Sequence, residues 1–185
     1  MPGERVTFGV PPAGRLGAPM TTVFEESSEA GFETFFRGNY RRLVRSITVA
    51  CGNEELAKDV VQQAFAQLWA EWPRISRYQS PADWVARVAI SRLRDHNRSL
   101  RRLGAALVRL GRPGDEADPA ARHDLDLTDA LLRLPLRQRL AVVLYYLDDR
   151  PVAQVAKIMD ISEGTVNRHL FRAREALRGY LQEEA

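Results

Sequence analysis

The sequence has little cysteine and no long apolar run. Cys51 is the only cysteine among 185 residues, which excludes an intramolecular disulfide and a cysteine-rich zinc site. A reducing compartment is therefore the natural location, and we expect the cytoplasm. No segment approaches the roughly 20 consecutive apolar residues of a membrane span, so we expect no stable membrane insertion.

Residue patterns of catalysis and metal binding are also missing. The three histidines, His96, His123 and His169, are far apart, and none has a second ligand at metal-binding spacing. The chain has no glycine-rich phosphate loop and no nucleophile signature. Its acidic pairs, Glu54–Glu55 and Asp148–Asp149, are most simply charges at helix ends. We therefore expect a protein that is not an enzyme and holds no metal or cofactor.

The sequence does contain helical periodicity and clustered positive charge. Hydrophobic residues make up 45% of the chain, which is enough for real cores, and no stretch shows the pattern of a β-strand. The formal net charge is only +3, yet the isoelectric point is about 9.3 and the basic residues are clustered. The sign of such patches says more about a partner than the total charge does, and basic patches suit nucleic acid.

The predicted fold is all-α, with two small helical domains joined by a flexible linker. Residues 1–28 are rich in proline and glycine and lack a continuous apolar run, which predicts a disordered leader rather than a signal peptide. The helical domains cover residues 29–102 and 127–185. Residues 103–126 are predicted to be the linker because residues 111–126 are rich in proline, glycine and acidic side chains.

Three helices are predicted in the first domain. Apolar residues at three- and four-residue steps indicate the first helix over residues 29–50. Asn53 is placed to cap the second helix, and Pro73 to end it. Ser80 followed by Pro81 supplies the cap and the first-position proline that begin the third helix.

The third helix is predicted to bury Trp84, Val88 and Leu93 and to carry the most basic run of the chain. Against Asp95 alone stand six arginines: Arg87, Arg92, Arg94, Arg98, Arg101 and Arg102. A helix with such a face can track a phosphate backbone, and Tyr78 in the preceding loop can offer its ring to an unstacked base. Trp84 could do the same, but it lies on the apolar stripe, where a core role is as well supported.

The second domain begins with two predicted helices. The first covers residues 127–133 and is stopped by Leu134 and Pro135. Pro135 then begins a longer helix. Its core-facing residues are predicted to be Leu140, Val143, Leu144 and Leu147.

Residues 151–180 look like a helix-turn-helix. Two apolar stripes follow each other at helical spacing: Val152, Val155, Ala156 and Met159, then Val166, Leu170, Ala173 and Leu177. The DNA-binding form of the motif needs a small residue at the helix crossing, a residue that tolerates left-handed backbone at the turn, and an apolar residue on the second helix. Ala156, Asp160 and Val166 stand at these offsets, with Asp160 where glycine is usual.

The second helix of this motif has the composition of a recognition helix. Ser162 is placed to cap it, and Glu163 suits its positive end. Side chains that can contact bases or phosphates are Ser162, Glu163, Thr165, Asn167, Arg168, Arg172 and Arg174. An ordinary helical hairpin with a solvated, charged face is the alternative interpretation of this pattern.

Two basic helical domains in this order resemble the sigma-70 family of bacterial RNA polymerase sigma factors, and the compact form resembles its extracytoplasmic-function group. The resemblance is carried by residues 57–69, by residues 83–95 and by residues 134–174. It implies an all-α protein that binds core RNA polymerase and promoter DNA, is a monomer when free, and allows an anti-sigma factor as a further partner.

The resemblance also implies roles for particular residues. The polymerase interface would include Asp59, Gln62 and Gln63, although an acidic residue is usual at the position of Gln63. The minus-10 element would be read and opened by Arg74, Arg77, Tyr78, Arg87, Ser91, Arg92 and Arg94. The minus-35 element would be read by the recognition helix. Ser91 stands where asparagine is common, and residues 167–169 replace a common Lys-Ser-Arg series, so the promoter sequence does not follow.

Two other functions fit parts of the pattern. In a conventional transcription regulator, residues 29–102 would dimerise or sense a signal, and only the second domain would touch DNA. In an adaptor, both domains would bind proteins. The basic run between Arg92 and Arg102 discriminates, because a sensing module has no need of it whereas a domain that opens promoter DNA does.

Overall fold

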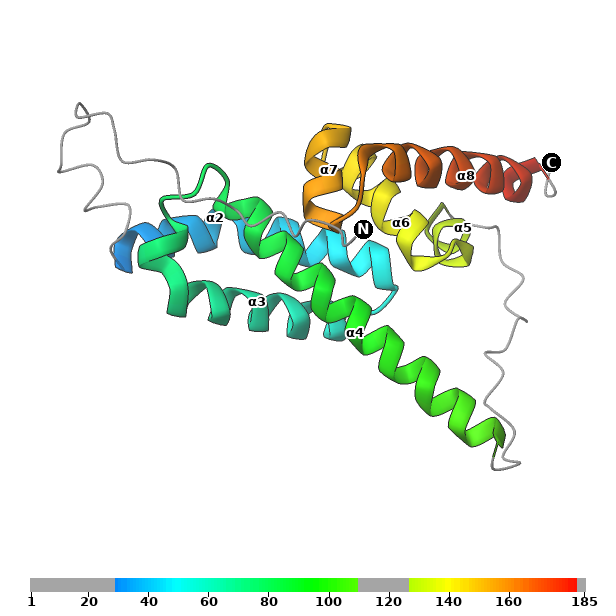
Figure 1. The fold of residues 1–185 in the computed structure, drawn as a ribbon, viewed down its shortest axis with the longest axis horizontal. Helices are drawn as coiled ribbons and strands as arrows, with labels where there is room; N and C mark the ends of the chain where they lie inside the picture. Colours follow the sequence, from blue (N-terminus) through cyan, green and yellow to red (C-terminus); the bar gives the residue numbers. More distant parts are fainter. Residues whose placement is uncertain (1–28, 110–126, 183–185) are drawn as a thin grey trace, which may run out of the picture.

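The computed structural model describes residues 29–109 and 127–182, and every regular element within them is helical (Figure 1). The expected all-α class is thereby confirmed. The expected leader and residues 110–126 of the expected linker lie outside the described residues. The elements are α2 (Glu29–Cys51), α3 (Glu54–Ile75), α4 (Pro81–Arg109), α5 (Leu127–Arg133), α6 (Leu136–Val142), the π-helical turn η1 (Val143–Leu147), α7 (Val152–Met159) and α8 (Glu163–Gln182).

The helices begin where the sequence predicts. A side-chain oxygen of each expected cap accepts a hydrogen bond from a backbone N–H in the first turn, which satisfies a donor that the helix itself cannot pair. These pairs are Asn53 Oδ1 with Leu56 N (2.9 Å), Ser80 Oγ with Asp83 N (3.2 Å) and Ser162 Oγ with Thr165 N (3.2 Å).

Two helices extend beyond their expected ends. Pro73 lies inside α3, so the prediction that it ends this helix is wrong. A proline removes its own N–H donor and crowds the carbonyl four residues earlier, but α3 ends two residues after Pro73, and its last turn is completed because Ser76 N–H donates to Trp72 O at 2.9 Å. Helix α4 continues to Arg109, through the first residues of the predicted linker, because the segment 103–109 consists mostly of good helix formers.

The turn η1 changes which side chains of the α6 segment reach the core. Leu140, Val143 and Leu144 are buried as expected, but Leu147 is 39% exposed, so its predicted core position is wrong. A π-helical turn contains one residue more than an α-helical turn. The extra residue rotates Leu147 away from the face on which Leu140 and Leu144 lie.

Helix α4 buries a different face from the one predicted. Trp84 and Val88 are only half-buried, whereas Leu93 is buried as expected. The buried side chains are those of Val85, Ala86, Ala89, Ile90 and Leu93. The shift arises because α4 packs against α3 on one side and against α7 of the second domain on another.

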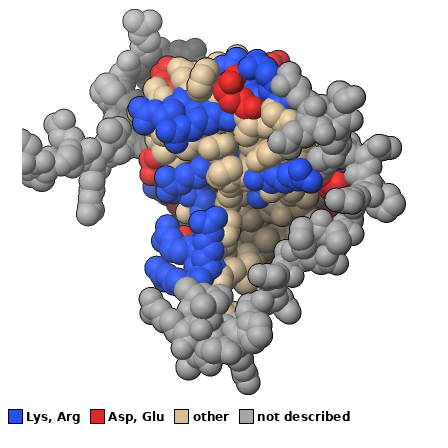
Figure 2. Space-filling model, turned by 90° about the vertical axis from the view of Figure 1, so that its right-hand side faces the viewer, with Lys and Arg blue, Asp and Glu red and all other residues tan. Residues whose placement is uncertain are grey.

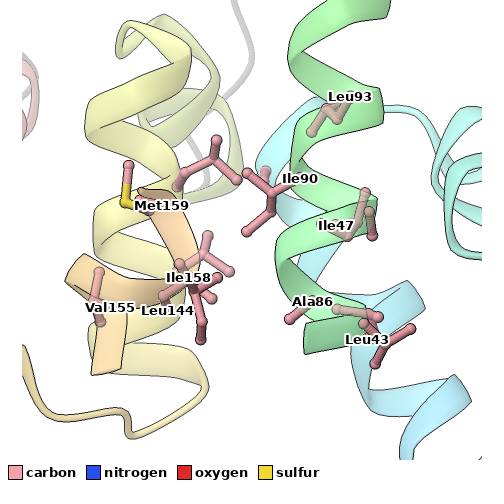
Figure 3. Close-up of a cluster of buried hydrophobic side chains, with 14 of the residues drawn as sticks. Leu43, Ile47, Ala86, Ile90, Leu93, Leu144, Val155, Ile158 and Met159 are labelled. Carbon is pink, nitrogen blue, oxygen red and sulfur yellow. The ribbon is translucent and has the colours of Figure 1, made fainter. Parts of the chain in front are cut away.

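The two domains share one apolar core. Figure 3 shows Ile90 of α4 pointing toward Ile158 and Met159 of the second domain, and Ile47 of α2 and Leu144 belong to the same cluster of buried apolar side chains. A further close approach occurs at Gly52, where φ is +71° and an added Cβ would lie 2.6 Å from Leu132 Cδ2 of α5. The structure is therefore a closed arrangement, in which α7 and η1 lie directly on the first domain.

A network of charged and polar side chains, which we call the latch, crosses the same interface. The Asp148 carboxylate is 5% exposed, accepts from Ser46 Oγ at 2.6 Å and lies 3.5 Å from Arg42 Nε. Arg150, at 9% exposed, lies 3.6 Å from Asp148 and also pairs with Asp83 of α4.

The latch is completed by Gln154, whose Nε2 donates to Asp83 Oδ1 at 2.6 Å. Residues of α2 and α4 thus bind Asp148 and Arg150, which precede α7, and Gln154, which lies in its first turn. Because a buried charge is tolerated only when it is paired, these groups fix the position in which the two domains meet.

We predict that Asp83→Ala opens the closed arrangement. The substitution leaves the buried Arg150 with only its longer contact to Asp148. Breaking a buried ion pair typically costs about 3 to 5 kcal/mol, and separating the domains avoids much of that cost by returning Arg150 to water. Small-angle X-ray scattering should show a larger radius of gyration, with helical content unchanged by circular dichroism.

Glu33→Ala is the matched control, because it removes the exposed Glu33–Arg37 pair on α2 and should leave the scattering unchanged. If Asp83→Ala scatters like the unchanged chain, the apolar contact alone holds the domains and the latch does not.

Candidate nucleic-acid interface

The turn between α7 and α8 has the geometry of a DNA-binding helix-turn-helix. Asp160 adopts the left-handed conformation, with φ 56° and ψ 52°, as its position in the motif requires. Ile161 N–H then donates to Ala156 O at 3.1 Å and closes the end of α7. Val166 is fully buried and packs α8 onto α7. The helix crossing predicted from the sequence is therefore present.

Helix α8 leaves its candidate contact face open. Asn167, Arg168 and Arg172 are exposed, and within the described part of the chain no hydrogen bond or ion pair engages their side chains. Thr165 is half-buried. Its Oγ1 lies 2.8 Å from Ser162 Oγ, so the two hydroxyls form a hydrogen-bonded pair at the first turn of α8.

Two other candidate contact residues of α8, Glu163 and Arg174, have different surroundings from Asn167, Arg168 and Arg172. Glu163 is exposed at the start of α8, where it suits the positive end of the helix. Arg174 is exposed, but its Nε donates to Leu170 O at 3.4 Å, so its guanidinium is drawn along the helix.

The loop between α3 and α4 presents an aromatic ring to solvent. Tyr78 is 38% exposed, and its backbone N–H donates to Ile75 O at 2.9 Å, which fixes the turn. Arg74 pairs with Glu71, and its guanidinium carbon lies 5.9 Å from the centre of the Tyr78 ring. Arg77 is exposed beside them. An exposed ring next to two cations can stack on an unpaired base while the cations hold its phosphates.

The basic run of α4 separates onto different faces. Four- and three-residue steps place five side chains on one stripe: Arg87, Ser91, Arg94, Arg98 and Arg101. Arg87 and Ser91 are exposed, whereas Arg94 is half-buried and its Nη1 donates to Met159 O, at the end of α7, at 3.3 Å. The stripe therefore begins beside the α3–α4 loop and reaches the second domain.

Arg92 lies off this stripe and is engaged by α3. Its Nη1 donates to Gln63 Oε1 at 3.1 Å, and its Nη2 donates to Gln67 Oε1 at 3.0 Å. The Gln63 amide in turn donates to both oxygens of Asp59, at 3.0 and 2.9 Å. The structure thus brings together one candidate DNA contact and two candidate polymerase contacts, while Gln62 is exposed on the same helix.

The face of the molecule that is turned toward the viewer in Figure 2 is predominantly basic in its described part. Figure 2 shows Lys and Arg side chains spread over it with few acidic ones among them, around a hollowed surface. The hollow that the structure defines on the basic side of α4 is a cleft of about 320 Å³, lined by residues of α4, α6 and α8. Its residues include Arg98 and Arg101 of the predicted basic run, and Arg137, which the sequence pattern did not assign to a site.

His169 of α8 lies in this cleft with both ring nitrogens buried and without a hydrogen-bond partner in the described chain. Burial lowers its pKa below the usual value, and the charges of Arg137, Arg172 and Arg168 lower it further. The imidazole is therefore neutral at pH 7, and its environment is one of converging positive charge.

Other chemistry finds little support in the described residues. Within residues 29–109 and 127–182, no three His, Cys, Asp or Glu side chains gather as a metal site. Burial raises the pKa of the Cys51 thiol, and its Sγ lies 3.1 Å from Asn53 O. None of the helices in these ranges has the length and apolar character to cross a bilayer.

The residues that sequence reasoning missed are those of the latch. The sequence pattern indicates a helix-end charge for Asp148 and no individual role for Asp83, yet both carboxylates meet Arg150 across the domain interface. The one signal in the sequence was an arginine within two residues of an acidic pair, a pattern too common to indicate burial.

Comparison with known proteins gives matches along most of the chain. Residues 35–103 match the family model for sigma-70 region 2, and residues 124–177 match that for sigma-70 region 4. The chain is 26% identical over 176 residues to the ECF RNA polymerase sigma factor SigM of Mycobacterium tuberculosis, covering 90% of this chain and 87% of SigM. It is 31% identical over 138 residues to SigL of the same organism, covering 71% of this chain and 78% of SigL.

Among solved structures, the fold is similar to that of the sigma factor RpoE in complex with the anti-sigma factor NepR from Bartonella quintana. The TM-score is 0.67 at 21% identity, over 82% of this chain and 97% of that one. At this level of identity the similarity concerns the fold.

Proposed function

Because the chain belongs to the extracytoplasmic-function group of the sigma-70 family of RNA polymerase sigma factors, we propose how its helices divide the steps of transcription initiation. It binds core RNA polymerase, directs the enzyme to promoters and assists in opening the DNA. The polymerase performs the chemistry, and the chain itself needs no catalytic residue or cofactor. It acts in the cytoplasm, where the polymerase and the DNA are. The observation that carries this proposal is the occurrence of regions 2 and 4, in order, on two helical domains with basic contact faces.

We assign the polymerase contact to the outer face of α3. Asp59, Gln62 and Gln63 are exposed there. The hydrogen bonds between Gln63 and Asp59 hold both side chains in place before binding, which lowers the entropic cost of forming the interface. Arg92 supports this pair from α4.

We assign minus-10 recognition and melting to the α3–α4 loop and the first half of the α4 stripe. Tyr78 offers a ring for a base that has left the stack, with Arg74 and Arg77 beside it to hold the phosphates. Arg87, Ser91 and Arg94 continue along the helix in the direction in which the strand would run. Arg92 contributes indirectly, because its guanidinium is engaged by Gln63 and Gln67.

We assign minus-35 recognition to α8 in the major groove. Asn167 and Arg168 provide side chains that read base edges, and Arg172 lies one turn further on, where it suits a phosphate. Ser162, Glu163, Thr165 and Arg174 flank them at the two ends of this face.

The closed arrangement must open before both elements can be read. Their nominal positions differ by about 25 base pairs, or roughly 85 Å of straight B-DNA at 3.4 Å per pair. In the structure, Arg94 of the minus-10 set hydrogen bonds to the end of α7 at 3.3 Å, and the Tyr78 loop is only about 20 Å further along α4, at 1.5 Å per residue. The domains therefore separate on the promoter.

Partners that bind the closed arrangement would hold the factor inactive. The solved relatives include a sigma factor in complex with an anti-sigma factor, and we propose such a partner for this chain as well. A conventional regulator with a sensing first domain is the less favoured function, because the first domain matches region 2 rather than a ligand-binding module.

The first test is transcription with purified components. Mixed with core RNA polymerase, the chain should co-elute in gel filtration and yield run-off transcripts from a subset of genomic fragments. Asp59→Ala with Gln62→Ala should weaken co-elution, whereas Glu54→Ala, an exposed change at the start of the same helix, should not. Failure to co-elute at low salt would exclude the sigma-factor function.

A second prediction concerns α8. Asn167→Ala and Arg168→Ala should change which minus-35 sequences are used, because a lost bidentate base contact costs about 1 to 3 kcal/mol at one position. Arg172→Ala should weaken all promoters about equally, since a phosphate contact does not depend on sequence. Transcription from a library with a randomised minus-35 element measures both. An unchanged preference profile in the first two variants would refute the assignment.

A third prediction separates melting from docking. Tyr78→Ala with Arg77→Ala should lower open-complex formation roughly tenfold to a hundredfold, the loss expected for a stacking contact of about 1 to 3 kcal/mol. Polymerase binding should be unaffected, and a premelted template should bypass much of the defect. Permanganate footprinting of thymines measures the bubble, with Gln79→Ala as the control in the same loop. Equal defects on duplex and premelted templates would assign the loop to docking instead.

A further inference from the structure

The cleft between the domains, which we call the basic cleft, has walls from both of them. One wall is the second half of the α4 stripe, with Arg94, Asn97, Arg98 and Arg101 at three- and four-residue steps on one face of the helix. The other wall is the start of α6, with Arg137, and His169 of α8. The cleft exists only while the domains are closed, because opening moves one wall away from the other.

Positive charge in the basic cleft is poorly compensated within the described residues. Four arginines line it, and none of its described lining residues is acidic. Arg98 has a long contact of 3.6 Å with Asp95, in which both side chains are largely exposed. For Arg101 and Arg137 the described part of the chain shows no carboxylate partner, whereas the exposed arginines Arg37 and Arg178 each have one.

Like charges on the two walls of a cleft repel, and this repulsion opposes domain closure. Burial is the main cause of the lowered pKa of His169, and the charge of Arg137, which lines the cleft, lowers it further. An anion in the cleft would therefore remove a repulsion and satisfy several donors at once.

The residues that line the basic cleft indicate which class of anion it would bind. Guanidinium groups match the oxygens of phosphate, often with two parallel hydrogen bonds. Among the described residues, no aromatic ring lines the cleft apart from His169, so they offer a nucleobase no larger ring to stack on. A volume of about 320 Å³ lies at the lower end of the range for small-molecule sites, which suits a compact ligand. A ligand made of several linked phosphates needs no stacking ring and is compact. Its phosphates can bind arginines on both walls.

We propose that the basic cleft is a regulatory site for a small polyphosphate anion, whose binding to both walls holds the two domains closed. A ligand that binds only the closed arrangement stabilises it in proportion to its concentration above the dissociation constant. The consequence for transcription rests on the proposed function: the anion would keep the factor from reading both promoter elements. Binding itself does not rest on that function.

The affinity experiment uses the full-length free chain and inorganic tripolyphosphate, measured by isothermal titration calorimetry at constant ionic strength. We expect saturable binding of one anion per chain. Arg101→Gln and Arg137→Gln, one on each wall, should each weaken it roughly tenfold, the loss of a charge-assisted contact. Arg102→Gln is the matched control, because it removes the same charge from the neighbouring position of α4 that does not line the cleft, and should change affinity less than twofold.

Two outcomes of this experiment would overturn the proposal. Absence of saturable binding would do so, and so would equal losses in Arg101→Gln and Arg102→Gln, which would indicate a diffuse attraction to basic surface. ATP, which carries the same three phosphates on a nucleoside, distinguishes the sources: equal affinity assigns recognition to the phosphates alone. Tighter binding of a single-stranded oligonucleotide that depends on Arg101 would make the cleft part of the DNA path and refute a small-anion site.

The conformational experiment uses small-angle X-ray scattering of the Asp83→Ala chain, which we expect to be open. Tripolyphosphate should restore the smaller radius of gyration, and should fail to do so when Arg137→Gln is added. Binding without any compaction would overturn the claim that the anion holds the domains closed. None of these measurements contains polymerase, so their failure is distinguishable from failure of the run-off test.

Discussion

A buried charge must be paired, and this requirement determines how the two domains meet. The Asp148 carboxylate lies in the interface between them, where Ser46, Arg42 and Arg150 surround it. Ile90 and other apolar side chains attract the two domains to each other across the interface. The hydrophobic effect has no direction, however, and would let one domain slide over the other. The latch does not tolerate it, because a small displacement would leave a carboxylate or a guanidinium buried without its partner. The energetic cost of an unpaired charge therefore selects one docking position.

The closed arrangement balances opposing electrostatic effects. The latch pairs opposite charges on one side of α4, while the basic cleft brings like charges together on another. Native stability is a small difference between large terms, and the same holds for two docked domains, so a ligand or partner worth a few kcal/mol can change the outcome. The proposed function, in which the factor is closed when free and extended on a promoter, needs such a balance, because a much tighter interface would prevent opening.

The sequence predicted most of the helices because their determinants are local. Caps such as Asn53 and Ser162 act on backbone three residues away, and the left-handed turn at Asp160 depends on its own backbone. The exposed face of α8 followed from the same periodicity. The latch did not, since Asp148 is paired with residues more than 100 positions earlier, and neither propensity nor spacing reports such a contact. The π-helical turn that exposes Leu147 is equally invisible to a count based on 3.6 residues per turn.

Helix α4 explains why the candidate sites could be placed by sequence only in part. Each residue advances about 100° around a helix, so neighbouring arginines of one basic run face different surroundings. Arg92 is turned toward α3 and its glutamines, Arg94 toward the end of α7, and Arg101 toward the basic cleft. Amino-acid composition predicts that all of these arginines bind phosphate, whereas packing gives each of them different surroundings. A single helix thereby connects the candidate polymerase face, the loop proposed to assist melting and the second domain, and a change in how α4 is packed would reach all three.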